Sequence, residues 1–563
     1  MKPTGSAGVA TAPALPQPDS IVQVPAGPAP AARGRLLLGC VVALAAALFV
    51  FRLSAGSLWD VDEPRYAEAG REMLAAGDLL TPRLNGVPWL GPAPVWMWAQ
   101  AASGRIFGFS EWSARLPAAL CGVGGVLATF ALGREWFGPR TGLLAALVLT
   151  TTLAYVVTAR LGVLDTAAAA WMVLALWAGY GAYRDRARAG YLLSSAFLAA
   201  GVLTRGPGTV VLPAATMLVF LAYRRALGRL REVPWGAAAA VFFVLAAPWY
   251  VLEAVRYGEP FLRAAVWGHA GRQLLAPPAA HAAALVTDAA ILVFGAVPWT
   301  AFLWGAAGYH YLRRWQDGSL LCLLWGGLVL LLAVAVGERL PADVLPLFPV
   351  AAIAVARLWE DFLFEGAGRL GRTLAASFAL QIGVVALLVV AAAAYATAQY
   401  PVEFAAVRDF LLAPIGVLVL GTGVTAVLFR MRRYTAAFLS LPAAMTVFIG
   451  IIYTGTLPAV ETQKPMKAVA AALRMAPGGL RADDRVIAYM AEAPAALVFY
   501  ARHPVEQAGD PAGLRRRVCA PGRVFVISRG DDVAGAGGVL RVLRRAGAQG
   551  RYVVLMKSGQ DTC

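Results

Sequence analysis

The sequence LLLGCVVALAAALFVFRLSAGSLWDVDEPRYAEAGREMLAAGD occupies residues 36–78 and joins an apolar run to a charged segment. The apolar run, 36–53, is close to the roughly 20 residues that cross a bilayer. No cleavable leader pattern precedes it, so we interpret it as a retained transmembrane helix. In the charged segment, Ala67, Met73 and Leu74 lie roughly at helical spacing. This spacing predicts a short helix on the membrane surface over 63–78.

The whole chain has the composition of a polytopic membrane protein. Hydrophobic residues make up 59% of its 563 residues, charged residues make up 14%, and the mean hydropathy is +0.65. An average soluble domain has roughly 25% charged residues. The composition therefore excludes a disordered chain, a fibrous repeat and an ordinary cytosolic enzyme. Membrane topology can explain the net charge of +17, so we expect no nucleic-acid partner.

Further apolar runs predict a polytopic α-helical fold with about thirteen transmembrane helices in all. The predicted spans are 36–53, 113–133, 141–158, 164–183, 190–204, 208–223, 235–252, 286–306, 319–336, 342–358, 372–393, 412–429 and 434–453. Residues 1–34 are rich in Pro, Ala and Gly, which predicts a disordered cytoplasmic tail. We expect a membrane domain over 35–459, with long outer loops at 54–112 and 253–285.

Arginines are distributed unevenly between alternate short loops. With the N-terminus in the cytoplasm, every second short loop on that side carries several arginines. The alternate short loops carry single arginines, namely Arg160, Arg205, Arg339 and Arg408. The positive-inside rule then predicts a cytoplasmic N-terminus and a C-terminal region outside the membrane.

The C-terminal region, 460–563, regains charged residues and predicts a small α/β domain. Predicted strands cover 485–490, 523–528 and 552–557, and predicted helices cover 470–476, 493–502 and 535–546. Cys519 and Cys563 also lie in this region. We expect free thiols there, with a disulfide between the two as the alternative.

Acidic residues at the outer membrane boundary are the first candidates for chemistry. Asp60, Asp62 and Glu63 directly follow the first predicted span. Carboxylates at an apolar boundary are functional candidates because burying them is costly. The alternative is an ordinary solvated loop. Asp165 falls on the same predicted side, where it could act in chemistry, cap a helix, or do both.

Basic residues on the same predicted side supply candidates for anion binding. His269 and Arg272 are three residues apart, so a helix would place them on one face. An arginine there could bind phosphate, and a histidine could ligate a metal or transfer a proton. Arg205 and Arg339 either reach lipid headgroups or capture an anion above the membrane. We find no P-loop, dinucleotide-binding, HExxH or GxSxG motif in a credible context.

The segment LWDVDEPRYAEAGREMLAAGDLLTPRLNGVPW at 58–89 resembles the aminoarabinose transferases that modify lipid A. These belong with the protein O-mannosyltransferases among glycosyltransferases of the GT-C fold that use polyprenyl-phosphate sugars. The resemblance rests on an Asp-Glu pair after the first span, followed by RYAE, REML, GD and NG. Weaker matches follow at 115–120, 161–165, 203–207, 247–250, 269–272 and 339–349. The resemblance covers nearly the whole chain.

The resemblance assigns roles to individual residues of this chain. Asp62 matches the catalytic acid, Asp165 matches the second outer acid, and Arg272 matches a phosphate-binding arginine. Further candidates are Arg65, Arg205 and Arg339 for the phosphate, and Glu63, Tyr66, His269 and Asp343 for other parts of the site.

The chain departs from the family pattern at two places. Gly91 and Pro92 stand where the family has Glu and Lys, and Asp343 stands where it has Tyr. In the family, the Lys helps to hold the lipid phosphate, and the Glu with the residue matching His269 can hold a metal. His269 is therefore the one candidate metal ligand, and Gly91 argues against a divalent metal cofactor.

The resemblance implies an inner-membrane glycosyltransferase with a periplasmic active site. We expect a polyprenyl-phosphate-linked sugar as donor, and a lipid A-like glycolipid or a protein as acceptor. A flippase for lipid-linked sugars and an inactive relative are the alternatives. Transporter sites usually lie near the bilayer midplane, whereas these acids lie at one interface.

Overall fold

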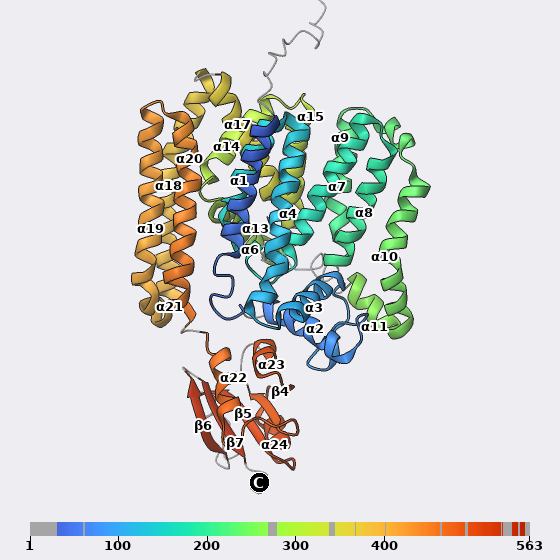
Figure 1. Cartoon of the computed structure of the whole chain (residues 1–563), viewed down its shortest axis with the longest axis vertical. Helices are drawn as coiled ribbons and strands as arrows, with labels where there is room; N and C mark the ends of the chain where they lie inside the picture. Colours follow the sequence, from blue (N-terminus) through green and yellow to red (C-terminus); the bar gives the residue numbers. More distant parts are fainter. Residues whose placement is uncertain are drawn as a thin grey trace, which may run out of the picture.

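The computed structural model describes residues 31–59, 62–267, 278–336, 344–365, 368–399, 401–461, 464–489, 494–530, 532, 543–549 and 552–557. A bundle of long helices stands on a layer of short outer helices, and a small sheet domain lies beneath that layer (Figure 1). The bundle helices are α1 Ala31–Val50, α4 Glu111–Phe137, α5 Pro139–Thr150, α6 Leu153–Ala159, α7 Asp165–Asp185, α8 Arg188–Arg205, α9 Gly208–Tyr223, α10 Trp235–Tyr257, α13 Pro278–Gly295, α14 Thr300–Leu312, α15 Asp317–Val336, α17 Leu347–Glu365, α18 Gly368–Gln399, α19 Pro401–Arg430 and α20 Tyr434–Ile451.

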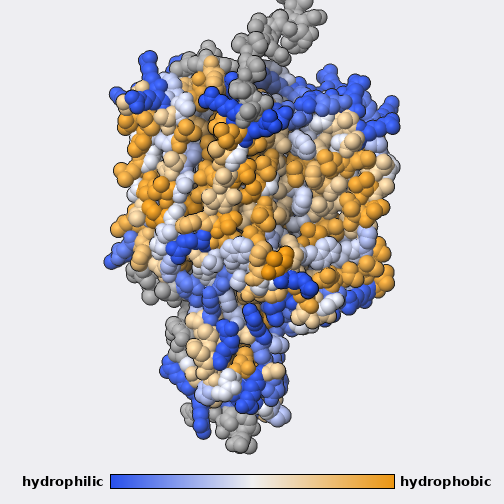
Figure 2. Space-filling model, in the orientation of Figure 1, coloured by the Kyte–Doolittle hydropathy of each residue, from blue (hydrophilic) through white to orange (hydrophobic). Residues whose placement is uncertain are grey.

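The bundle has the architecture of a membrane protein. Within the described residues, six helices are long and apolar enough to cross a bilayer, or up to eight if each bent helix pair forms one span. Figure 2 shows a broad hydrophobic band across this face of the bundle, with hydrophilic residues at both ends and over the C-terminal domain. A membrane-type helical fold is thus confirmed, and the count of thirteen spans stays a prediction.

Local sequence signals set the boundaries of the helices. Ser110 caps α4 because its hydroxyl accepts a hydrogen bond from Ser113 N, and the Ser113 hydroxyl in turn accepts one from Ser110 N. Gly138, with a φ of 106°, ends α4, and Pro139 begins α5.

Small residues allow close helix contacts inside the bundle. Tyr155 of α6 donates from its hydroxyl to Gly122 O of α4 over 3.0 Å. A Cβ added at Gly125 would lie 1.9 Å from that hydroxyl, so only glycine fits there.

The outer layer consists of α2 Asp62–Ala76, the hairpin strands β1 Arg83–Leu84 and β2 Val87–Pro88, α3 Val95–Phe107, α11 Glu259–Leu262 and the π-helical turn η3 Arg263–Trp267. The predicted helix over 63–78 is confirmed as α2. Several of its residues, including Ala67, Glu68, Ala69 and Gly70, are buried by protein. The helix α2 therefore packs against other parts of the protein on two sides, and most of its apolar residues face protein.

The C-terminal domain contains a five-stranded mixed sheet in the order β4-β3-β5-β7-β6. Its strands are β3 Arg485–Tyr489, β4 Val505–Ala508, β5 Val524–Arg529, β6 Arg544–Gln549 and β7 Tyr552–Lys557, and its helices are α22 Met466–Met475, α23 Pro494–Ala501 and α24 Pro511–Val518. β3 pairs in parallel with β4 and β5, whereas β7 is antiparallel to β5 and β6. The π-helical turn η4 Ile452–Thr456 and α21 Leu457–Glu461 connect α20 toward this domain.

Two expectations for the C-terminal region were wrong. The end of the predicted helix 535–546 belongs to strand β6, because β7 offers an open edge that pairs with Arg544–Gln549. The rest of that predicted helix, apart from Leu543, lies outside the described residues. Cys519 is disulfide-bonded rather than a free thiol. Its proposed partner, Cys563, also lies outside the described residues.

Candidate functional site

Asp62 begins α2 at the outer boundary of the bundle. Its side chain is 56% exposed, and Arg65 Nη1 lies 3.9 Å from Asp62 Oδ1, one helical turn away. The N-terminal end of a helix stabilises a negative charge. Asp62 is therefore a solvent-accessible carboxylate, and its ion pair with Arg65 is loose.

Tyr66 lies one turn further along α2 and marks the point where the two candidate acids meet. Burial raises the pKa of the Tyr66 phenol well above its usual range, and the charges of Asp165 and Asp62 raise it further, against Arg205 and Arg65. The Tyr66 ring packs against Trp89 with 5.6 Å between centroids. The site therefore contains a neutral phenol that is near enough to both carboxylates to feel their charges.

Asp165 and Arg205 form an ion pair between the outer ends of α7 and α8. Both side chains are partly buried, with exposed fractions of 18% and 27%. Asp165 is the first residue of α7, and the residue at its N-cap is Leu164, so the capping prediction was wrong by one position. Arg205 therefore orients Asp165, and the pair places charge beside Tyr66.

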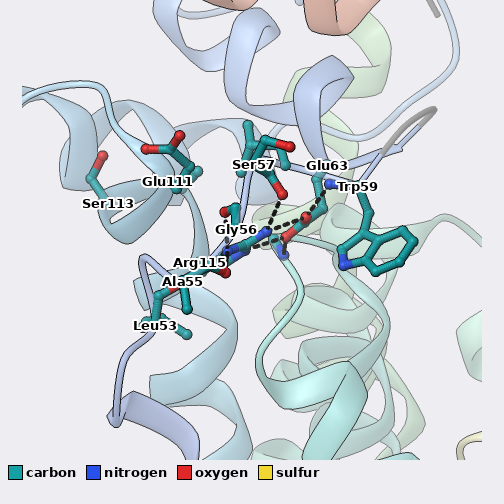
Figure 3. A network of polar contacts seen from close by, with 12 residues as sticks. Leu53, Ala55, Gly56, Ser57, Trp59, Glu63, Glu111, Ser113 and Arg115 are labelled. Carbon is teal, nitrogen blue, oxygen red and sulfur yellow. Dashed lines mark hydrogen bonds and ion pairs between the residues drawn. The ribbon is translucent and has the colours of Figure 1, made fainter. Parts of the chain in front are cut away.

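Glu63 forms the centre of a buried hydrogen-bond network with Arg115 of α4 (Figure 3). Arg115 donates to both carboxylate oxygens over 3.0 Å, and the backbone amides of Trp59 and Gly162 donate over 2.6 and 2.5 Å. Arg115 also donates to the backbone carbonyls of Leu53, Ala55, Gly56 and Ser57. Glu63 is only 2% exposed. These contacts anchor the start of α2 and occupy both carboxylate oxygens of Glu63 with donors from the protein itself.

Gly91 shows how the chain departs from the family pattern in three dimensions. Its φ is +114°, a left-handed conformation that side chains rarely adopt. A Cβ at this position would lie 3.3 Å from the Ala264 carbonyl oxygen. The loop thus approaches η3 closely, and a glutamate could not replace Gly91 without a shift of the backbone.

Other predicted site residues cannot be placed. His269, Arg272, Arg339 and Asp343 lie outside the described residues. In the part of the chain that the structure describes, no group of three His, Cys, Asp or Glu side chains could hold a metal ion. The described part of the site is therefore made of Asp62, Arg65, Tyr66, Asp165 and Arg205.

Sequence reasoning missed Arg115 as the partner of Glu63. The signal was present, because Arg115 is a lone arginine near the start of a predicted transmembrane run. A charge at such a position must be paired. Sequence reasoning also missed Asp78, whose carboxylate accepts hydrogen bonds from the backbone amides of Leu80 and Thr81 and forms an ion pair with Arg256 of α10.

Comparisons with known proteins agree with this fold. Residues 91–251 match the family model described as dolichyl-phosphate-mannose-protein mannosyltransferase. The undecaprenyl phosphate-alpha-4-amino-4-deoxy-L-arabinose arabinosyl transferase of Edwardsiella ictaluri is 27% identical over 442 residues, covering 76% of this chain and 78% of the relative. The protein of the same name from Aeromonas salmonicida is 30% identical over 335 residues, covering 57% of this chain and 59% of the relative.

A solved structure matches over nearly the whole chain. ArnT from Cupriavidus metallidurans, crystallised with undecaprenyl phosphate, is 21% identical with a TM-score of 0.78, covering 93% of this chain and 99% of that one. Its apo form is 22% identical with the same TM-score, covering 95% of this chain and 100% of that one. The resemblance to the aminoarabinose transferases is confirmed, and the fold is of the GT-C type.

Proposed function

We propose that this chain, with its GT-C fold, is a glycosyltransferase that moves a sugar from a polyprenyl-phosphate donor to an acceptor on the periplasmic face. The proposal rests on two ion pairs at this end of the bundle, Asp165 with Arg205 and Asp62 with Arg65, whose charges all act on the buried Tyr66 phenol. Similar proteins are named as transferases that use undecaprenyl-phosphate-linked aminoarabinose, and a protein of the same fold binds undecaprenyl phosphate. The acceptor we favour is a lipid A-like glycolipid, with a protein as the alternative.

The proposed reaction is one displacement at the anomeric carbon of the donor sugar. An acceptor hydroxyl or phosphate oxygen forms the new bond, and the bond from the anomeric carbon to the phosphate oxygen breaks. Where the acceptor is a hydroxyl, its proton passes to Asp62, and the electron pair of the broken bond stays on the departing polyprenyl phosphate. A single displacement inverts the anomeric centre.

The arginines of the site differ in how well they could bind the departing phosphate. Arg65 is 43% exposed, and its contact with Asp62 is loose at 3.9 Å. Arg205 is engaged by Asp165. Arg65 is therefore the better placed of the two to stabilise the growing negative charge. Arg272 and Arg339 stay predictions for the same role.

We propose an inner-membrane location with a cytoplasmic N-terminus, a tail at 1–34, a membrane domain of about thirteen spans at 35–459 and a periplasmic domain at 460–563. The arginine bias of the short loops supports this orientation. The disulfide at Cys519 also supports it, because disulfides persist in oxidising compartments such as the periplasm.

The test uses purified protein in lipid with a panel of radiolabelled polyprenyl-phosphate sugars. Wild type is compared with Asp62→Asn, and with Asp185→Asn as a matched control. Asp185 is an exposed carboxylate at the opposite end of α7 from Asp165, paired with Arg184. We expect the wild type and Asp185→Asn to release polyprenyl phosphate, and Asp62→Asn to release none.

Three results would each overturn part or all of the proposal. A folded Asp62→Asn variant with full transfer would remove Asp62 from the chemistry. Movement of intact donor across sealed vesicles without cleavage would instead support a flippase. Absence of turnover across the whole panel would favour an inactive relative, in which Gly91 and Pro92 replace the charged pair of the family.

A further inference from the structure

We propose that the C-terminal domain is a clamp that holds α2 from both ends, with Asn85 and Tyr500 as positioning residues. The proposal extends the proposed function, because α2 carries Asp62 and Tyr66. Figure 1 shows the domain directly beneath the outer helices, with α23 and β4 nearest to them. Three sets of contacts carry the inference.

The first contact lies just before α2. The Tyr500 hydroxyl of α23 accepts a hydrogen bond from Leu58 N over 2.7 Å and donates to Glu111 Oε1 over 3.3 Å. Lys467 of α22 donates to the same Glu111 oxygen over 2.5 Å. The segment entering α2 is thereby tied to the domain and to the start of α4.

The second contact lies just after α2 and involves the Asn-Gly turn. Asn85 and Gly86 have φ values of 58° and 79°, as a two-residue hairpin turn requires. The Asn85 side chain donates to Val505 O over 2.7 Å and accepts from Val505 N over 2.9 Å. β4 is an edge strand, so the Asn85 amide pairs with it as a neighbouring strand would.

The Asn-Gly turn passes this restraint on to α2. The backbone amides of Asn85 and Gly86 donate to the two carboxylate oxygens of Glu72 over 2.6 and 2.9 Å. Glu72 lies near the C-terminal end of α2. A continuous chain of hydrogen bonds therefore runs from the sheet edge through the turn to the helix.

The third contact is apolar and fixes the rotation of α2. Ala67 and Leu58 belong to the same buried cluster as Val486, Phe499 and other residues of the C-terminal domain. Other α2 side chains, such as Met73, pack instead against α3. The helix is held between two surfaces, and Tyr66 is adjacent to Ala67 in the sequence. A shift of the domain would therefore move Tyr66 and Asp62 relative to Asp165.

Loosening the clamp should change catalysis more than donor binding. Misplacing a catalytic group by about 1 Å can cost about 100-fold in rate. Asp62 and Arg65, the groups proposed to act in the transition state, both lie on α2, whereas Arg205 and Arg272, which could also contact the donor, lie outside it. We therefore expect a fall in kcat of at least about tenfold, with the KM for donor changed by less than about threefold.

The experiment compares three clamp variants with one control inside the domain. Asn85→Gly keeps the left-handed backbone and removes the side chain. Asn85→Asp places a carboxylate oxygen against the Val505 carbonyl and should be worse than Asn85→Gly. Tyr500→Phe removes the hydroxyl that contacts Leu58 and keeps the ring. Asp510→Ala is the matched control, because Asp510 caps α24 within the domain through Gly513 N.

Two readouts are measured, namely amide hydrogen exchange over 62–76 and steady-state turnover of donor. We expect amide exchange in α2 to become faster, and kcat to become lower, from wild type to Asn85→Gly and further to Asn85→Asp. Tyr500→Phe should change both quantities in the same directions, and Asp510→Ala should stay close to wild type. Unchanged exchange in Asn85→Gly and Tyr500→Phe would overturn the clamp. Faster exchange with unchanged kcat would overturn its role in positioning. If wild type turns over no donor, the proposed function fails, and exchange alone decides the clamp.

Discussion

Replacing Glu63 by glutamine tests the claim that this carboxylate supports the site without touching substrate. The change keeps the size of the side chain and removes one acceptor oxygen and the charge. Glu63 Oε1 accepts from Arg115 Nε and Gly162 N, and Oε2 accepts from Arg115 Nη2 and Trp59 N. In Glu63→Gln one oxygen becomes an NH2 group that faces two donors.

The magnitude follows from which partners remain. Breaking a buried ion pair by removing one member costs about 3–5 kcal/mol. In Glu63→Gln, Arg115 keeps its bonds to the backbone carbonyls of residues 53 and 55–57, so we expect a loss near the lower end, about 3 kcal/mol. In Arg115→Met those carbonyls and the Glu63 carboxylate lose their donor together, so we expect about 5 kcal/mol.

The assay is unfolding of purified protein by SDS titration in mixed micelles, followed by tryptophan fluorescence. Asp185→Asn is the control and should unfold with the wild type. A Glu63→Gln protein within about 1 kcal/mol of wild type would refute the reasoning, because one lost charged hydrogen bond alone is worth more. A fully stable Glu63→Gln protein with no transfer would instead make Glu63 a catalytic residue.

Three further predictions concern the outer loops. Arg205→Gln removes the ion pair that orients Asp165, and donor turnover should fall at least about tenfold in kcat, equivalent to about 1.4 kcal/mol. Gly91→Glu, which restores the family residue, should lower the stability by about 1–3 kcal/mol, because φ is +114° and Ala264 crowds the Cβ. A thermal scan of Gly91→Glu that matches the wild type would contradict this. Burial alone would raise the pKa of Asp78, but bonds from the Leu80 and Thr81 amides and from Arg256 outweigh it and lower the pKa. The ionised Asp78 side chain thus stabilises the loop at pH values above its unfolded pKa of about 4. This stabilisation is lost as the pH falls through the lower pKa of the folded state. In thermal scans, the stability difference between wild type and Asp78→Asn should therefore shrink below about pH 4.

Much of the fold could be predicted because apolar runs and arginine placement act locally. The helix α2 and the strands β3, β5 and β7 were predicted within two residues at each end. Asp62 and Asp165 were placed on the same side of the membrane, and the structure brings both close to Tyr66. These successes rest on helical spacing, on strand composition and on the alternation of short loops.

The rest depended on contacts between segments far apart in the sequence. Nothing local links Asn85 to Val505, which are 420 residues apart, or Leu58 to Tyr500. The first three residues of strand β6, 544–546, fell at the end of the predicted helix 535–546, and pairing with β7 makes them part of a strand. A strand that depends on a partner cannot be identified from its own residues alone.

The adjacent acids Asp62 and Glu63 show how one motif supplies both a reactive group and its support. Successive side chains of a helix point about 100° apart, so the start of α2 directs them to different surroundings. Glu63 points into the protein, where a guanidinium and two amides saturate its oxygens. Asp62 points outward, where Arg65 lies 3.9 Å away and water can enter. A carboxylate whose oxygens already accept bonds from fixed donors has no oxygen left for a substrate hydroxyl, whereas an exposed carboxylate can still accept such a bond. The occupied oxygens of Glu63 and the exposure of Asp62 support the proposal that Asp62 takes part in the chemistry while Glu63 positions α2.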